Sequence, residues 1–241
     1  MLTIPIEKLV SVLLIFLAIL VSLIIAIKSL RSYRENKQNL TILIAIGSIF
    51  IACAMIFLVI EQVFLSSDLP FTNEFLGVYV FGATATVLSG CAAAAFAAFA
   101  FEMAFPKNTL KLTLIASVIV SLYVISWLVD AKEVIDEEIH FLSMTPFGIP
   151  FIPLLSYFTL IPIMSVPIFV LFYYALKVRK ETPVASKRAL LLGIGGLCLA
   201  TAYIVELLGI DEVTTTIFRS LFVVASVLFY IALFKVKKKI D

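Results

Sequence analysis

Long apolar segments separated by short polar connections dominate the hydrophobic pattern of this chain. Each of seven such segments is long enough to cross a hydrocarbon core of ~30 Å as a helix. They lie near residues 8–29, 40–63, 75–104, 109–130, 149–177, 187–209 and 213–234. None of the connections has room for a water-soluble domain. The pattern therefore predicts a single all-α integral membrane domain over residues 1–241, built as a bundle of seven transmembrane helices.

The third apolar segment carries a face of small side chains. Small residues recur there at every fourth position, namely Gly82, Thr86, Gly90, Ala94 and Ala98. In lipid, helices associate by close approach of their backbones, and small residues four apart permit that approach. We expect this segment to be the central helix of the bundle, with these five residues serving in helix packing.

Composition agrees with a chain that lies in a lipid bilayer. Hydrophobic residues make up 63% of the sequence and charged residues only 14%, whereas a soluble domain usually carries about a quarter charged residues. The apolar run at residues 9–27 is longer than the core of a signal peptide, and its positive cluster follows the run instead of preceding it. We expect this run to be retained as the first span.

Basic residues fall on alternate connections, and this sets the expected orientation. Of the 18 lysines and arginines, 15 lie in four stretches, namely 28–37, 107–111, 177–188 and 235–239. Lysine and arginine favour the cytoplasmic side of a membrane. The distribution predicts an N-terminus outside, a C-terminus inside and a multi-pass protein of the cell membrane.

Ionisable residues inside the spans are the candidates for a functional site, because burying them in a membrane is costly. Arg219 lies well inside the seventh segment, while Glu206 and Glu61 lie near the expected outer ends of the sixth and second segments. We expect them to form an outward-facing, ligand-binding pocket. Aromatic residues expected to line it are Tyr203, Trp127 and Tyr123. The alternative is a structural Arg–Glu pair with aromatic residues anchoring the interface.

The sequence offers little for catalysis or cofactor binding. It contains no phosphate-binding loop, no HExxH and no Ser/His/Asp set, and its one histidine, His140, lies in an expected outer connection. Cys53, Cys91 and Cys198 lie within separate spans without a CxxC pair. We therefore expect no enzyme, no metal, no cofactor and no nucleic-acid partner. The acidic stretch 130–138 is expected to be a solvated cap.

Several short motifs resemble one membrane family. The first inner connection reads RSYRENKQNLTILIAIG, the second span ends in VIEQV with Glu61, and the third ends in FAFEMAFPKNT with Glu102. The sixth opens with SKRALLLG and the seventh with IDEVTTTIF. Together they resemble the seven-transmembrane N-terminal sensor region of bacterial and archaeal histidine kinases, here without the kinase domain. Microbial rhodopsins, which also have seven spans, are excluded because the seventh segment contains no lysine for retinal.

The resemblance implies a receptor-like sensor module. Such a module binds an unknown small ligand from outside and signals to a separate cytoplasmic or membrane protein partner. Two alternatives remain open at this point. One is a small transporter or channel, for which Arg219 and the proline-containing fifth segment provide candidate gating elements. The other is a structural or assembly subunit of a membrane complex, with the small face of residues 82–98 as its partner surface.

Overall fold

The described part of the computed structural model covers residues 6–65, 80–135, 155–208 and 212–236. Over these residues the chain forms seven α-helices and no strand. They are α1 (Ile6–Asn36), α2 (Asn39–Leu65), α3 (Ala83–Ala104), α4 (Thr109–Ile135), α5 (Leu155–Lys177), α6 (Pro183–Leu208) and α7 (Glu212–Tyr230). A short 3-10 turn, Pro106–Asn108, links α3 to α4, and a π-helical turn, Ile231–Lys235, extends α7.

Six of these helices are long and apolar enough to cross a membrane. This agrees with the prediction of an all-α, multi-pass membrane protein. In α5 the stretch counted as apolar, Ile161–Lys177, is shorter than in the other six. A seventh crossing and the orientation of the bundle therefore stay predictions.

The predicted segments coincide with the helices to within a few residues at most ends. The exceptions are α1, which runs on to Asn36, α4, which runs on to Ile135, and α3, which begins only at Ala83. The predicted residues 75–79 and 149–154 lie outside the described residues.

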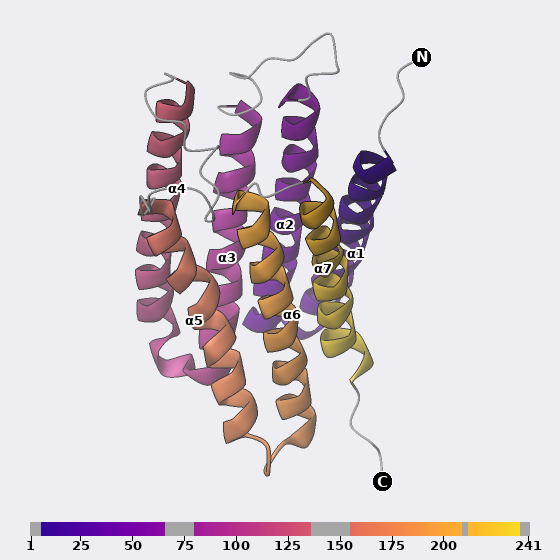
Figure 1. Ribbon diagram of the computed structural model, residues 1–241. Coiled ribbons are helices and arrows are strands. Elements are labelled where there is room, and N and C mark those ends of the chain that lie inside the picture. Colours follow the sequence, from indigo (N-terminus) through magenta and orange to yellow (C-terminus); the bar gives the residue numbers. More distant parts are fainter. Residues whose placement is uncertain (1–5, 66–79, 136–154, 209–211, 237–241) are drawn as a thin grey trace.

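The helices close into a ring (Figure 1). Following the contacts around it, α1 packs on α2, α2 on α3, α3 on α5, α5 on α6, α6 on α7, and α7 back on α1. Helix α4 lies outside this ring and packs on α3 and α5. Burial follows the same arrangement. In the most apolar stretch of α3, 56% of the residues are buried, whereas in that of α4 only 11% are. Up to Ile125, most side chains of α4 thus lie on the outside of the bundle.

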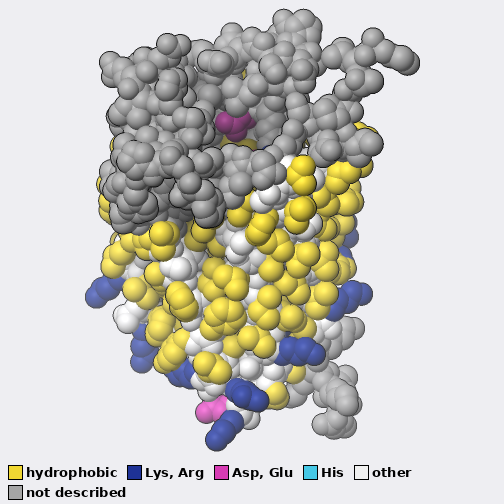
Figure 2. Space-filling model, viewed as in Figure 1, with side chains coloured by type: hydrophobic (Ala, Val, Ile, Leu, Met, Phe, Trp, Pro, Cys, Tyr) yellow, Lys and Arg dark blue, Asp and Glu magenta, His cyan; other side chains and the backbone are white. Residues whose placement is uncertain are grey.

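Apolar side chains fill the space that the helices enclose. One cluster joins α1, α2, α6 and α7 through residues that include Ile15, Met55, Ala202 and Phe222. A second cluster joins α3, α5, α6 and the π-helical turn. On the face that Figure 2 shows, the described surface between the helix ends is largely apolar, and basic side chains gather at the end of the bundle where α7 ends.

The small face of α3 lies inside the bundle. Four of its residues, Gly82, Thr86, Gly90 and Ala98, are buried, and Ala94 is half-buried. At Gly90 the approach of α4 is close, because a Cβ there would lie 2.9 Å from Cγ1 of Val120 and 3.3 Å from Cγ2 of Val124. A hydrogen at this position is what lets the two helices come together.

Gly90→Ala is expected to lower the free energy of unfolding by about 1–2 kcal/mol, because Val120 is a stiff, β-branched neighbour that must shift. The matched control is Gly47→Ala in α2, where a Cβ would be in ordinary contact with the Cβ of Ala95 at 3.4 Å and the carbonyl oxygen of Ala92 at 3.9 Å. Alanine is the better helix former, so the control is expected to be neutral or slightly stabilising. Unfolding of both variants in mixed detergent measures the difference. Equal stability of the two variants would contradict this account of the α3–α4 contact.

Candidate functional site

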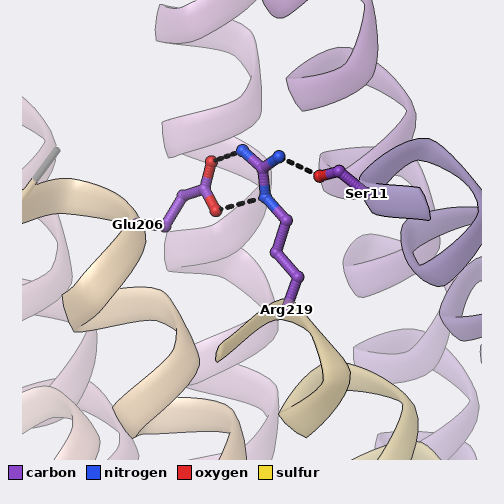
Figure 3. A network of polar contacts seen from close by, with 3 residues as sticks. All are labelled: Ser11, Glu206 and Arg219. Carbon is purple, nitrogen blue, oxygen red and sulfur yellow. Dashed lines mark hydrogen bonds and ion pairs between the residues drawn. The ribbon is translucent and has the colours of Figure 1, made fainter. Parts of the chain in front are cut away.

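Arg219 of α7 binds side chains from two other helices (Figure 3). Its Nε donates to Oε2 of Glu206 in α6 at 2.7 Å, and its Nη2 donates to Oε1 of the same carboxylate. Its Nη1 donates to the hydroxyl oxygen of Ser11 in α1. One guanidinium group thus joins α1, α6 and α7.

The direction of the chain explains why Arg219 and Glu206 meet. Helices α6 and α7 are antiparallel neighbours, linked by residues 209–211 only. Side chains on a helix lean toward its N-terminus. Arg219 therefore leans toward the end of the bundle where α7 begins, whereas Glu206 leans away from that end. The two side chains converge between the helices, although Arg219 lies about two turns inside α7.

The pair is almost removed from solvent. The side chain of Arg219 is 8% exposed and that of Glu206 is 11% exposed. A bidentate guanidinium–carboxylate pair is among the stronger polar contacts in proteins. In a membrane bundle each charge is costly alone, and pairing offsets much of that cost. The geometry is that of a clamp between helices.

Ser11 is a part of this network that the sequence analysis missed. It is 2% exposed, and two further serines of α1, Ser22 and Ser29, are equally buried. The three are spaced by eleven and seven residues, which places them on one face of a helix. That periodicity within an apolar segment was a usable sign of a polar contact with a neighbouring helix.

Two tyrosines extend the polar cluster toward α4. The hydroxyl oxygens of Tyr203 in α6 and Tyr123 in α4 lie 2.7 Å apart, and Tyr123 is 1% exposed. Ser89 of α3 lies beside the hydroxyl of Tyr203. Tyr203 precedes Glu206 by three residues, so the two side chains lie on neighbouring positions of one helix face.

Glu61 of α2 is half-buried and close enough to Glu206 for the two carboxyl groups to influence one another. It also acts electrostatically on Tyr203. No cationic partner of Glu61 is found among the described residues. Among the described residues, two carboxyl groups, those of Glu61 and Glu206, therefore lie near the guanidinium of Arg219.

The structure thus brings together five of the six expected site residues, namely Arg219, Glu206, Glu61, Tyr203 and Tyr123. Trp127 lies in α4, and its side chain is outside the described residues. Residues 136–138 of the acidic stretch and His140 fall outside the described residues, and nothing is described of the side chains at 130–135. In the described segments, no group of three or more His, Cys, Asp or Glu side chains has the arrangement of a metal site.

A second set of contacts ties the same three helices at the opposite, basic end. The Nζ of Lys28 in α1 donates to the hydroxyl of Tyr230 in α7 at 2.7 Å. Arg188 of α6 donates through Nε and Nη2 to the carbonyl oxygen of Val236, just after the π-helical turn, at 3.2 and 2.8 Å. Helices α1, α6 and α7 are therefore held to each other by polar contacts at both ends.

Comparisons with protein-family models, with curated proteins and with solved structures yield no match to this chain. The resemblance to histidine-kinase sensor regions consequently rests on its sequence motifs alone.

We expect Arg219→Gln and Glu206→Gln each to lower the free energy of unfolding by about 3 kcal/mol, because each leaves the other charge buried without its partner. The double variant should lose less than the sum of the single losses, with a coupling of about 1–3 kcal/mol. Arg34→Gln, at an exposed position, is the control and should change the stability by less than about 0.5 kcal/mol. Strictly additive losses in this double-mutant cycle would contradict a stabilising bond between Arg219 and Glu206.

Proposed function

We propose that this protein is a receptor-like sensor module of the cell membrane, which binds a small ligand at the Arg219 cluster and signals to a separate protein partner. The observation that carries the proposal is the position of Arg219. It holds α1, α6 and α7 together through Glu206 and Ser11, and the other ends of the same helices carry the basic contacts of Lys28 and Arg188. A change at one end therefore has a direct route to the other.

The proposed arrangement has seven spans, with the N-terminus outside and the C-terminus inside. In this orientation the Arg219 cluster belongs to the outer half of the bundle. The basic end faces the cytoplasm, as the distribution of lysine and arginine favours. Cysteines introduced at Lys107 and Lys180, both exposed at the basic end, should then react with impermeant reagents only from the cytoplasmic side.

The proposed trigger is an exchange of partners at the guanidinium. A ligand carboxylate or phosphate offers Arg219 the same two-oxygen geometry as Glu206. Once Glu206 is displaced, α6 and α7 lose their polar bond at the outer end while the contacts at the basic end persist. Helix α7 is then free to tilt about that end. The ligand causes this change if it binds more tightly to the state in which Glu206 is displaced than to the state in which Glu206 is bound to Arg219.

An acidic ligand is expected to raise the thermal stability of the wild type and to leave Arg219→Gln unchanged. At a ligand concentration of 100 times its Kd, the stabilisation is about 2.7 kcal/mol. The screen covers small carboxylic and phosphorylated acids, with amines, sugars and lipids as other classes. Ser11→Ala is the matched control, because it removes one contact of Arg219 and keeps its charge.

Two results of this screen would overturn the proposed ligand site. One is that no compound stabilises the wild type, and the other is that a compound stabilises the wild type and Arg219→Gln equally. If Ser11→Ala loses less than a few-fold in affinity for the ligand, the hydrogen bond between Arg219 and Ser11 is not required for recognition.

Glu61 gives a specific reason to keep a small transporter as the second candidate. A carboxyl group without a cationic partner, beside a second carboxyl group in a membrane bundle, is a common feature of proton and cation pathways. Uptake by protein-containing liposomes tests it. A transporter would acidify the vesicle interior in a substrate-dependent way that Glu61→Gln abolishes, whereas a sensor would leave the pH unchanged.

The subunit alternative loses its main argument. It depended on the small face of residues 82–98 being available to a partner, yet most of that face is buried within the chain's own bundle. Close contacts at Gly90 with Val120 and Val124 occupy the tightest point of the face. A different surface would have to serve a partner.

A further inference from the structure

A cluster of cationic and aromatic side chains lies where α1 and α7 meet at the basic end. The ammonium group of Lys28 lies 4.7 Å from the centre of the Tyr230 ring and 5.4 Å from that of Phe234. It also donates to the Tyr230 hydroxyl at 2.7 Å. Lys235, one turn later, is close enough to act electrostatically on the same hydroxyl.

The cluster has unused capacity to bind an anion. Lys28 contacts aromatic rings and a hydroxyl but no carboxylate in the described part of the chain. An ammonium group has three donors, and within the described segments Lys28 uses one of them, toward Tyr230. The Tyr230 oxygen accepts from Lys28, while no acceptor for its own proton is found among the described residues. Lys28 and Lys235 are both exposed.

Apolar surface continues from this cluster toward the middle of the bundle. On α1 the exposed neighbours are Ile24, 45% exposed, and Ile27, 51% exposed, within one turn of Lys28. On α7 the corresponding residue is Val227, 41% exposed and one turn before Tyr230. A molecule that fits both parts has a negatively charged head and long apolar chains.

We propose that Lys28, Tyr230 and Lys235 form a binding site for the phosphate of an anionic membrane phospholipid at the α1–α7 seam. The two ammonium groups provide the charge and the tyrosine hydroxyl donates to a phosphate oxygen. The acyl chains lie along Ile24, Ile27 and Val227. A free phosphate would satisfy the cationic part of the site but leave the apolar part uncovered. The proposal does not depend on the ligand site at Arg219.

A lipid bound at this site would help to hold the end of α7 against α1. Phe234 and Tyr230 belong to the last turns before Val236, whose carbonyl oxygen accepts from Arg188. A headgroup held between Lys28 and Lys235 adds a bridge from α1 to the turn that follows α7. Lipid composition would thereby influence how firmly α7 is held at the basic end.

Native mass spectrometry of the full chain, titrated with phosphatidylglycerol or phosphatidylcholine, tests the site. The wild type should bind phosphatidylglycerol more tightly, and the double variant Lys28→Gln with Lys235→Gln should lose about tenfold in affinity, since each basic group near a lipid surface contributes several-fold. Tyr230→Phe keeps both charges and the ring, and should lose about two- to threefold.

The matched control is Lys107→Gln with Lys111→Gln, which removes two exposed basic groups at the same end of the bundle. It should lose less than about twofold, because these lysines lie away from the α1–α7 seam. Equal losses in the two double variants would overturn the proposal in favour of diffuse attraction between the basic end and anionic lipid. Displacement of phosphatidylglycerol by millimolar inorganic phosphate would overturn it in favour of a free-anion site. Unchanged thermal stability of each variant in neutral detergent shows that the fold is retained.

Discussion

A buried arginine in a membrane bundle has to be paired, and the placement of Arg219 governs much of this structure. Its guanidinium group donates two hydrogen bonds to Glu206 and one to Ser11, so α1, α6 and α7 are joined at one depth. An isolated charge there would cost several kcal/mol. The closure of the ring between α7 and α1 is thus favoured by a polar contact as well as by apolar packing.

The two ends of the α1–α6–α7 group differ in kind. At the Arg219 end the contacts are buried and directional, and two carboxyl groups, Glu206 and Glu61, lie near one guanidinium. At the basic end the contacts of Lys28 and Arg188 are exposed. Salt screens buried pairs only weakly, whereas exposed charges are screened by salt and attracted by anionic lipid headgroups. The proposed sensor module would need such a division, with ligand binding at the buried end and lipid binding at the exposed end.

The helices were largely predictable from the sequence, because runs of apolar residues of about 20 have few alternatives in lipid. The pairing of Arg219 with Glu206 followed from the short link between their helices. Ser11 was missed, although its spacing from Ser22 and Ser29 marks a polar face of α1, because that spacing does not show which helix the face meets. The position of α4 outside the ring was equally hidden, because the order of contacts depends on side-chain fit, as at Gly90 and Val120, and not on hydropathy.

The most direct test of the account is the distance between the end of α7 and the α3–α4 turn, measured between spin labels at Lys235→Cys and Lys107→Cys in lipid nanodiscs. The native cysteines Cys53, Cys91 and Cys198 would first be replaced by alanine. If Arg219 holds α7 in place, the distance distribution is narrow in this background and becomes shifted or broadened when Glu206→Gln is added. Identical distributions with and without Glu206→Gln would contradict the claim that this pair controls the position of α7.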